Sequence, residues 1–272
     1  MSQVIRIESA DDDRVADYRV VSDPLLQRAS GLFVAEGRLV VQRVLEDRRF
    51  RPKSLLLSEV SRRALEPWLS TLGADVTVYV CAIDAFRDIT GFNIHRGCLA
   101  LVERPAPLSC ADAIEAAKLV VVLENVANPD NMGGIFRNAA AFGVDAVLLS
   151  PGCSDPLYRK AIRTSMAASL RVPFARLGAW PGVIAELRAR RFVTAALTPR
   201  EPAMTLGAFV AGCSDRVALL VGTEGAGLSP EIEAAADVLV RIPIRADVDS
   251  LNVSAAVAIA LHALSARTVS LG

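Results

Sequence analysis

Residues 118–124 read KLVVVLE, five consecutive apolar residues between a lysine and a glutamate. A strand with one solvated face alternates apolar and polar residues, whereas a strand that is covered on both faces is apolar throughout. The run therefore predicts a strand of a parallel sheet with helices on both faces, which is an α/β fold. Four later runs have the same character and predict further strands of this sheet: VDAVLLS (144–150), RFVTAAL (191–197), RVALLVG (216–222) and DVLVRIPI (237–244).

The first hundred residues show a second, smaller α/β pattern. Short apolar runs alternate there with amphipathic stretches of helical length, which predicts a small α/β/α domain. The following segment 104–117, RPAPLSCADAIEAA, contains two prolines and many small residues and is typical of a linker. We therefore expect one domain over residues 1–106 and a larger one over residues 107–272. The strands expected in the first domain are GLFVAEG (31–37), KSLLLSE (53–59), VTVYV (76–80) and CLALVE (98–103).

The composition favours a soluble protein. The chain has 272 residues, of which 52% are hydrophobic, and this is enough for one large core or two modest ones. No stretch reaches the roughly 18 uninterrupted apolar residues of a membrane helix, and the N-terminus lacks the apolar core of a signal peptide. We expect a cytoplasmic location. The five cysteines are odd in number and show no C-x-x-C spacing, so neither a disulfide framework nor a metal site is expected.

The formal net charge is zero, so no basic field over the whole chain indicates a nucleic-acid partner. Cationic residues nevertheless cluster, and such clusters can bind phosphate groups. For any single cluster, a solvated helix face is the more ordinary explanation. The clusters are Arg48 to Lys53, Arg62 with Arg63, Arg159 to Arg163, and Arg188 to Arg191.

Three of the predicted strands are followed by polar segments rich in glycine or asparagine. Ligands of open parallel sheets bind at the carboxyl ends of the strands, where these segments begin. The glycines of GTEGAG do not have the G-x-G-x-x-G spacing, and no Lys-Ser/Thr pair follows, so a nucleotide phosphate loop is not expected and a tight turn explains them. The segments are ENVANPDNMGGIFRNAAAFG (124–143), GTEGAGLSPEI (222–232) and IPIRADVDSLNVSAAVAIALH (242–262).

Two of these segments place polar residues at a helix start. In the first, we expect Asn131 as the cap and a helix over residues 133–142, with Arg137 one turn from the start and on the same face as Gly133. The helix dipole favours anions there, so an arginine suggests a ligand role, and its guanidinium suits phosphate or carboxylate. In the third segment, capping explains either Ser250 or Asn252 but not the pair.

The three segments, in this order, resemble the three motifs of the SpoU family of RNA ribose 2′-O-methyltransferases, within the SPOUT superfamily. Residues 33–41 and 95–103 also resemble the substrate-binding domain of that family, with Arg96 where the family often has glutamine. The matched motifs are N-x-G-x-x-x-R-x-A-x-x-F-G at 131–143, G-x-E-G-x-G-L at 222–228 and I-P-x(6)-S-L-N-V-S at 242–254.

The resemblance implies a deep trefoil knot in the C-terminal domain, S-adenosylmethionine bound in the knot, and an active site at a homodimer interface. It implies an RNA substrate, and we expect rRNA rather than tRNA because a separate N-terminal domain is typical of the rRNA branch. No metal is implied. The catalytic residues implied are Asn131, Arg137, Glu224, Ser250 and Asn252. The cofactor-binding residues implied are Leu197, Thr198, Gly222, Thr223, Glu224, Gly225, Ile242, Ser250 and Leu251.

The chain offers no obvious general base for the ribose hydroxyl. Its two histidines are His95, in the first domain, and His262, on an apolar helix where we expect a core histidine. A guanidinium is effectively always protonated, so we expect Arg137 to bind the substrate phosphate and orient the hydroxyl while a phosphate oxygen or water takes the proton.

Two alternative functions stay open. A methyltransferase for a base nitrogen would have a different third motif, and a non-catalytic RNA-binding relative would lack motif residues. A dehydrogenase is disfavoured, since the dinucleotide fingerprint is absent.

Overall fold

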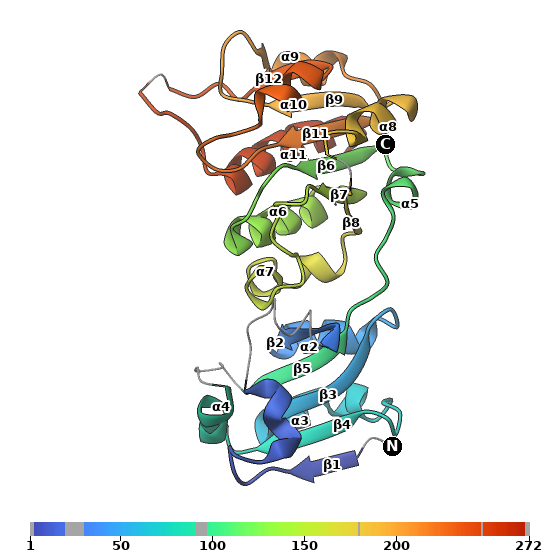
Figure 1. Cartoon of the computed structure of the whole chain (residues 1–272), viewed down its shortest axis with the longest axis vertical. Coiled ribbons are helices and arrows are strands. Elements are labelled where there is room, and N and C mark those ends of the chain that lie inside the picture. Colours follow the sequence, from blue (N-terminus) through green and yellow to red (C-terminus); the bar gives the residue numbers. More distant parts are fainter. Residues whose placement is uncertain (1–2, 20–29, 91–96, 179, 246, 270–272) are drawn as a thin grey trace. The chain divides into compact units, whose positions relative to one another are not determined.

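The computed structural model describes residues 3–19, 30–90, 97–178, 180–245 and 247–269 (Figure 1). The chain divides into two compact units. The first comprises Met1–Ala106 and Leu157–Leu170, and the second comprises Pro107–Pro156 and Arg171–Gly272. The segment Leu157–Leu170, which the expected two-domain division assigns to the larger domain, thus packs with the first unit.

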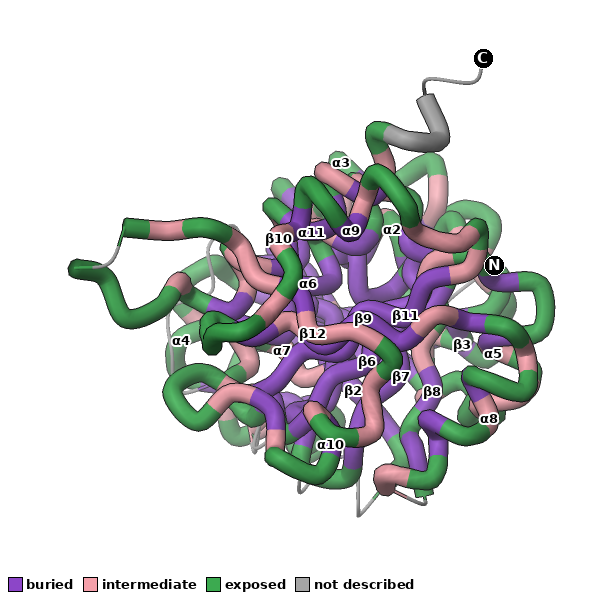
Figure 2. The backbone as a smooth tube through the Cα atoms, turned by 90° about the horizontal axis from the view of Figure 1, so that it is seen from above, coloured by how far each residue is buried: buried purple, intermediate pink, exposed green. Residues whose placement is uncertain are grey.

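The second unit contains a seven-stranded sheet in which every strand pair is parallel. Its strands are β6 (Leu119–Leu123), β7 (Ala146–Leu149), β8 (Phe174–Arg176), β9 (Val193–Leu197), β10 (Met204–Thr205), β11 (Val217–Val221) and β12 (Val238–Arg241). They are ordered β10-β12-β9-β11-β6-β7-β8. The five predicted strands and the parallel sheet are confirmed, and β8 and β10 are short additions. The central strands are buried along their length (Figure 2).

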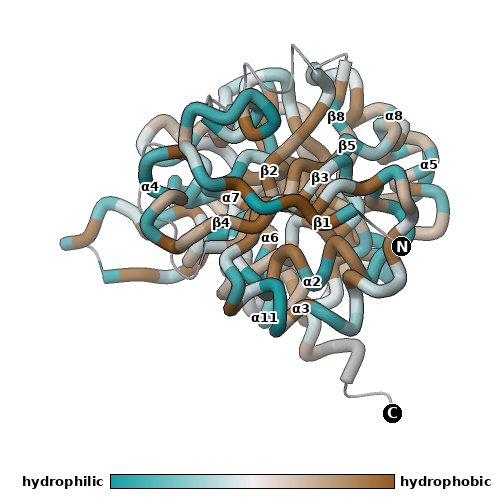
Figure 3. The backbone as a smooth tube through the Cα atoms, turned by 90° about the horizontal axis from the view of Figure 1, so that it is seen from below, coloured by the Kyte–Doolittle hydropathy of each residue, from teal (hydrophilic) through white to brown (hydrophobic). Residues whose placement is uncertain are grey.

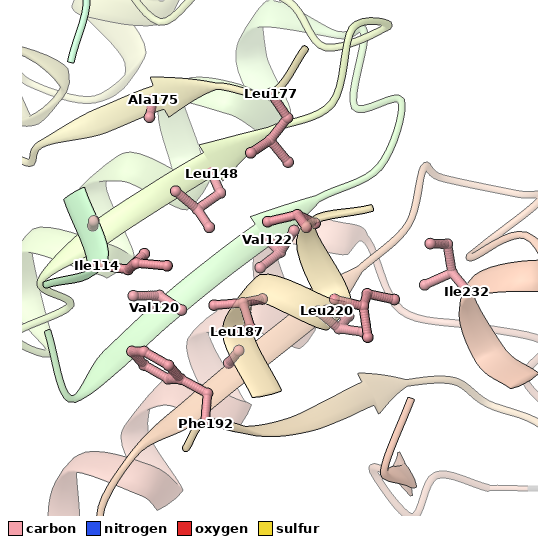
Figure 4. Close-up of a cluster of buried hydrophobic side chains, with 14 of the residues drawn as sticks. Ile114, Val120, Val122, Leu148, Ala175, Leu177, Leu187, Phe192, Leu220 and Ile232 are labelled. Atoms are coloured by element: carbon pink, nitrogen blue, oxygen red, sulfur yellow. The ribbon is translucent and has the colours of Figure 1, made fainter. Parts of the chain in front are cut away.

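Helices cover both faces of this sheet, as predicted. On one face, α5, α8 and α10 close over a cluster that includes Val120, Val122 and Leu187 (Figure 4). On the other, Phe136 of α6 packs edge-on against Phe174, next to Ala175 of the first cluster and therefore on the opposite face. Helices α9 and α6 both pack against α11. The helices are α5 (Cys110–Ile114), α6 (Pro129–Ala141), α8 (Val183–Ala189), α9 (Leu206–Gly212), α10 (Pro230–Ala235) and α11 (Val253–Val269).

The first unit is a five-stranded mixed sheet between two helical layers, so the predicted α/β/α domain is confirmed. Strand β5 runs antiparallel to β2 and β3, and the other pairs are parallel. The apolar strands β2 and β3 contribute much of its buried hydrophobic surface (Figure 3). The strands are β1 (Gln3–Arg6), β2 (Leu32–Glu36), β3 (Arg51–Ser58), β4 (Thr77–Cys81) and β5 (Cys98–Glu103), in the order β1-β4-β3-β5-β2. The helices are η1 (Asp13–Tyr18) and α4 (Ile83–Thr90) on one face, and α2 (Arg38–Glu46) and α3 (Glu59–Leu69) on the other.

Helix α7 (Arg159–Thr164) and the 3₁₀ turn η2 (Ala168–Leu170) complete the first unit. Helix α7 packs on β2, and the Glu36 carboxylate there forms ion pairs with Arg159 (3.5 Å) and Arg163 (3.4 Å). Part of the third cationic cluster is therefore neutralised within the protein. The contact joins residues more than a hundred positions apart in the sequence, which is why no local pattern predicts it.

None of the described helices is long and apolar enough to cross a membrane. All five cysteines are free, and Cys81, Cys98 and Cys153 are buried. Burial raises the pKa of Cys81 to about 11 and the pKa of Cys98 to about 12, so both thiols are protonated at neutral pH.

The C-terminal end of α7 contains an unusual backbone arrangement. The Met166 N–H donates to the Arg163 carbonyl (3.1 Å) and the Ala167 N–H donates to the Ile162 carbonyl (3.0 Å). This is the Schellman pair of hydrogen bonds, whose left-handed residue is usually glycine. Here Met166 has φ +52° and Ala167 has φ +66°, a region that side chains with a Cβ rarely adopt.

We expect Met166→Gly to stabilise the protein by up to about 1 kcal/mol, because glycine enters the left-handed region without the steric cost of a Cβ. The exposed methionine side chain gives up few contacts. Thermal unfolding monitored by circular dichroism measures the change. Ala168→Gly is the matched control: Ala168 has no positive φ, so this change should lower stability by about 0.5–1 kcal/mol. A lower melting temperature for Met166→Gly would contradict the assignment of strain.

Candidate functional site

The three polar segments meet at one edge of the second sheet. Asn131 lies in the first turn of α6, Glu224 lies in the loop after β11, and Asn252 immediately precedes α11. Because all strands of this sheet are parallel, the segments after β6, β11 and β12 leave from the same edge (Figure 1).

Asn131, Glu224 and Asn252 form a closed set of hydrogen bonds. The Asn252 amide nitrogen donates to Oδ1 of Asn131 (2.9 Å) and to Oε1 of Glu224 (3.1 Å). The Asn131 amide nitrogen donates to Oε2 of Glu224 (2.9 Å). Both carboxylate oxygens therefore accept from an amide, and hydrogen bonds to a charged acceptor are stronger than neutral ones. Each of the three motifs supplies one member of this network.

Asn252 also begins helix α11. Its Oδ1 accepts from the backbone N–H groups of Ser254 (3.0 Å) and Ala255 (3.3 Å), as an N-cap side chain does. One residue thus caps the helix with its oxygen and joins the network with its nitrogen. Ser250 does not cap the helix; it is exposed and lines a pocket. The two polar residues of the third segment therefore have separate positions and roles.

The loop after β11 is a tight turn, as its glycines predict. The Gly227 N–H donates to the Thr223 carbonyl (3.0 Å), and Gly225 and Gly227 have φ +87° and +73°. A Cβ on Gly222 would lie 2.0 Å from the carbonyl carbon of Gly227, so only glycine allows the two ends of the turn to approach this closely. The turn carries Glu224 near its tip.

A pocket lies beside this network, at the carboxyl ends of β9, β11 and β12. Most of its wall is apolar side chains and glycine backbone, and Glu224 is the one charged side chain among the residues that line it. All nine residues implied for cofactor binding lie in this wall: Leu197, Thr198, Gly222, Thr223, Glu224, Gly225, Ile242, Ser250 and Leu251. The wall also includes Pro199, Val221, Gly227, Ile244, Val253 and Ala256.

Helix α6 begins earlier than expected. Pro129 occupies its first turn and Asn128 is the cap, accepting from the Asp130 N–H (2.8 Å), so the expected start at residue 133 and the expected cap Asn131 are wrong. The reason is that proline is favoured in the first turn, where its missing N–H costs nothing. Asn131 thereby has its side chain available for the network.

Arg137 consequently lies two turns into α6, beyond the reach of the helix dipole, so that part of the argument for a ligand role fails. It does share a face with Gly133, as expected, because the two residues are four apart within α6; Gly133 is buried and Arg137 is exposed. Gly134 faces α11, since a Cβ there would lie 2.3 Å from the Ser254 hydroxyl. Among the residues that the structure describes, the Arg137 guanidinium has no hydrogen bond or ion pair, and it is not part of the amide–carboxylate network.

His262 takes no part in the network. The prediction that His262 is a core residue is wrong: it is exposed on α11, with its ring 5.7 Å from the ring of Phe142. His95 and Arg96 lie outside the described residues. The network thus consists of one carboxylate and two amides.

Several cationic clusters are neutralised by ion pairs within the described chain. Arg62 pairs with Glu59 (3.0 Å) and Glu66 (2.8 Å), and Arg188 pairs with Asp237 (2.7 Å). These pairs are the solvated-face arrangement that the sequence pattern left open. They give no indication of a phosphate site at those helices.

Glu124 is a residue that the motif pattern does not single out. It follows β6 directly, is only 4% exposed, and accepts hydrogen bonds from Ser229 and Trp180. The sequence signal that could have identified it is a carboxylate placed immediately after a fully buried strand, where an ionised group needs partners within the protein.

Known proteins resemble this chain over most of its length. Residues 118–262 match the model described as the SpoU rRNA Methylase family. An uncharacterised tRNA/rRNA methyltransferase of Mycobacterium bovis is 41% identical over 257 residues, which cover 93% of this chain and 88% of that protein. The 23S rRNA (guanosine(2553)-2′-O)-methyltransferase RlmP of Bacillus subtilis is 26% identical over 261 residues, which cover 95% of this chain and 98% of that protein.

Solved structures share the fold. The AdoMet-bound rRNA methyltransferase from Sinorhizobium meliloti superposes with a TM-score of 0.80 at 23% identity, covering 98% of this chain and 99% of that one. The agreement extends over both units, so the smaller first unit belongs to the shared architecture as well.

The double role of Asn252 can be separated by substitution. We expect Asn252→Ala to lower the free energy of unfolding by about 1 kcal/mol, whereas Asn252→Ser, which keeps a capping oxygen, should change it by no more than about 0.3 kcal/mol. Chemical denaturation measures both. Equal losses in the two variants would show that the contacts with Asn131 and Glu224, rather than the cap, carry the stability.

Proposed function

The chain belongs to the SpoU rRNA methylase family, and we propose that it is an RNA methyltransferase that transfers a methyl group from S-adenosylmethionine to a ribose 2′-hydroxyl. The observation that carries the proposal is the pocket lined by Leu197, Gly222 and Leu251 and bordered by the network of Asn131, Glu224 and Asn252. Ribosomal RNA is the favoured substrate class, since the Bacillus subtilis relative named for 23S rRNA aligns with 95% of this chain and so with both units.

The pocket fits the proposed cofactor. Leu197, Ile242 and Leu251 provide apolar surface for an adenosine, and the glycine backbone after β11 provides hydrogen-bonding groups without side chains in the way. S-adenosylmethionine supplies an electrophilic methyl group on a cationic sulfur when bound. Glu224 is the one acidic side chain in the wall, and its carboxylate favours a positive charge in the pocket.

Arg137 is the residue proposed to bind the substrate phosphate. Its guanidinium is exposed and uncommitted within the described chain, and its planar fork matches two phosphate oxygens. Holding the phosphate orients the neighbouring ribose hydroxyl. The guanidinium keeps its own proton, so the hydroxyl proton passes to a phosphate oxygen or to water. Ser250, exposed at the pocket wall, offers a hydroxyl to the same substrate.

The active site is proposed to form between two copies of the chain. Asn131 and Arg137 are six residues apart on α6, so their side chains point about 120° apart around the helix axis. With Asn131 directed at its own pocket, Arg137 is directed elsewhere and is available to a second copy. In a homodimer with two-fold symmetry, the Arg137 of each copy would lie at the pocket of the other copy, which gives two equivalent sites.

Helix α11 offers the surface for such a dimer. A stripe of small and apolar residues with a histidine runs along its exposed side at helical spacing: Ala255, Ile259, His262 and Ala266. Ile259 is 43% exposed, which is unusual for so large an apolar side chain in the middle of a long helix. The neighbouring helix α6 exposes Ala140 and Arg137. A helix that is apolar on all sides is expected to be covered.

Further features follow from family membership as parts of the proposal. Residues 1–106 would form the RNA-binding domain and residues 107–272 the methyltransferase domain, with Leu157–Leu170 packed on the former. The deep trefoil knot would lie in the methyltransferase domain, next to the cofactor pocket. A cytoplasmic location agrees with an RNA substrate.

The direct test incubates the protein with labelled S-adenosylmethionine and separate pools of unmodified rRNA and tRNA, followed by mass spectrometry of the digested RNA. A 2′-O-methyl nucleotide in the rRNA pool is the expected result. Methylation of a base nitrogen would overturn the ribose assignment, and methylation of tRNA alone would overturn the substrate class. Absence of cofactor binding by calorimetry would overturn the enzyme assignment.

We expect Arg137→Lys to lower kcat by about 10-fold to 100-fold at saturating RNA, because a lysine cannot reproduce the two-pronged contact with phosphate. The melting temperature should be unchanged, since Arg137 is exposed and makes no described contact. Lys118→Ala, which removes an exposed cation before β6 at the opposite edge of the sheet, is the control and should leave kcat unchanged. Near-full turnover of Arg137→Lys would contradict the proposed role of Arg137 in binding the substrate phosphate.

We expect Ile259→Arg to convert dimers into monomers in analytical ultracentrifugation and to abolish activity, because two copies of a new charge would meet at a two-fold interface. Val60→Arg, at an even more exposed apolar residue of α3 (68% against 43% for Ile259), should leave the dimer intact. Mixing inactive Arg137→Ala and Glu224→Ala proteins should restore part of the activity if Arg137 serves the partner's pocket. A monomeric, active parent protein would rule out the dimer.

A further inference from the structure

Glu124 joins three segments at the pocket edge of the second sheet. Its Oε1 accepts from the Trp180 indole N–H (2.9 Å) and the Ser229 hydroxyl (2.8 Å), and its Oε2 accepts from the Ser229 backbone N–H (2.8 Å). Its own N–H donates to the Val221 carbonyl (2.8 Å), which continues the pairing of β6 with β11. The residue therefore connects the end of β6, the turn before α8 and the end of the loop after β11.

The partners of Glu124 require a carboxylate. An indole N–H and a backbone N–H can only donate, and each of them meets a different oxygen of Glu124. A glutamine would have to turn its NH₂ group toward one of these donors, which leaves two donors facing each other in a buried place. No described cation forms an ion pair with Glu124, so its charge is stabilised by neutral donors alone.

The Ser229 side chain contacts Glu124 instead of capping helix α10. It stands at the N-cap of α10, yet its side chain makes no capping hydrogen bond and instead donates to Glu124. A serine at this position ordinarily accepts from the helix N–H groups. Its hydroxyl and its backbone N–H are both directed to one carboxylate, which fixes the backbone at the end of the loop.

The position of the loop Gly222–Leu228 follows from this contact. The loop starts directly after Val221, the last residue of β11, and ends one residue before Ser229, and the hydrogen bond from the Gly227 N–H to the Thr223 carbonyl closes its middle. With both ends fixed and the middle closed, Glu224 has little freedom to leave Asn131. Five residues of this loop line the pocket: Gly222, Thr223, Glu224, Gly225 and Gly227.

We propose that Glu124 is a positioning residue for ligand binding: through Ser229, it sets the loop that forms one wall of the pocket and presents Glu224. The proposal deepens the proposed function and rests on it for the identity of the ligand. Glu124 does not touch the pocket itself, so its effect should appear as weaker binding and a more mobile loop rather than as a loss of chemistry.

The test compares two carboxylates that each accept hydrogen bonds from the backbone N–H and the hydroxyl of a single residue. Asp237 accepts from the Thr194 backbone N–H (2.8 Å) and hydroxyl (2.6 Å), just as Glu124 accepts from both groups of Ser229, but it precedes β12 at the opposite edge of the sheet. Asp237 is exposed and also pairs with Arg188 (2.7 Å), so Asp237→Asn is a control for the loss of this pair of hydrogen bonds away from the pocket. The Kd for S-adenosylmethionine is measured by calorimetry, and loop motion by hydrogen exchange of the peptide covering residues 222–229.

We expect Glu124→Gln to weaken cofactor binding by about tenfold or more and to speed exchange in the loop, while Asp237→Asn changes the Kd by less than about twofold. Equal effects of the two variants, or unchanged exchange in Glu124→Gln, would overturn the proposal. Hydrogen exchange is measured without ligand, so it tests the role of Glu124 independently of cofactor binding. If the parent protein bound no S-adenosylmethionine, that result would overturn the proposed function but not the role of Glu124.

A second variant covers the case in which Glu124→Gln does not fold. Ser229→Ala removes one donor, keeps the backbone contact, and should weaken binding in the same direction but less. Where both single variants fold, the double variant should bind no more weakly than Glu124→Gln, because both changes break one connection. Additive losses would show that Glu124 does not act through Ser229.

Discussion

The parallel direction of the strands in the second sheet is the constraint on which the candidate site depends. The segments after β6, β11 and β12 are distant in sequence, yet they leave the sheet at one edge because the strands run the same way. Asn131, Glu224 and Asn252 come from these three segments and lie within hydrogen-bonding distance of one another. If one of these strands were antiparallel, its segment would leave from the opposite edge and the network could not form.

The site uses amides and carboxylates where many enzymes use histidine. Each amide has a donor and an acceptor, so Asn131 and Asn252 both donate to the Glu224 carboxylate and still accept other hydrogen bonds through their oxygens. Asn252 likewise has two roles, because its oxygen caps α11 and its nitrogen donates to Glu224. Glu124 is likewise held by neutral groups, since it accepts from an indole N–H, a hydroxyl and a backbone N–H.

Predictions from local sequence patterns are wrong where an adjacent residue, or a residue close in space, changes the position of a helix or a side chain. The start of α6 was misplaced because Pro129 begins the helix before the glycines, and this moved Arg137 away from the helix end. His262 lies on an apolar helix but faces outward, since α11 is apolar on all sides and its pattern does not reveal which face is covered. The segment Leu157–Leu170 belongs to the first unit, where α7 packs on β2 and forms ion pairs with Glu36, and no local pattern marks these contacts.

The sequence by itself determined the two α/β patterns, the continuous apolar strands and the three motif segments. Strands buried on both faces require apolar residues throughout, and tight turns require glycine. It also indicated which residues would line the pocket. Only the tertiary structure decided that Asn252 rather than Ser250 caps the helix, that Arg137 points away from Asn131, and that Glu124 holds Ser229. These outcomes depend on side-chain direction and on contacts between distant segments, which the order of residues does not specify.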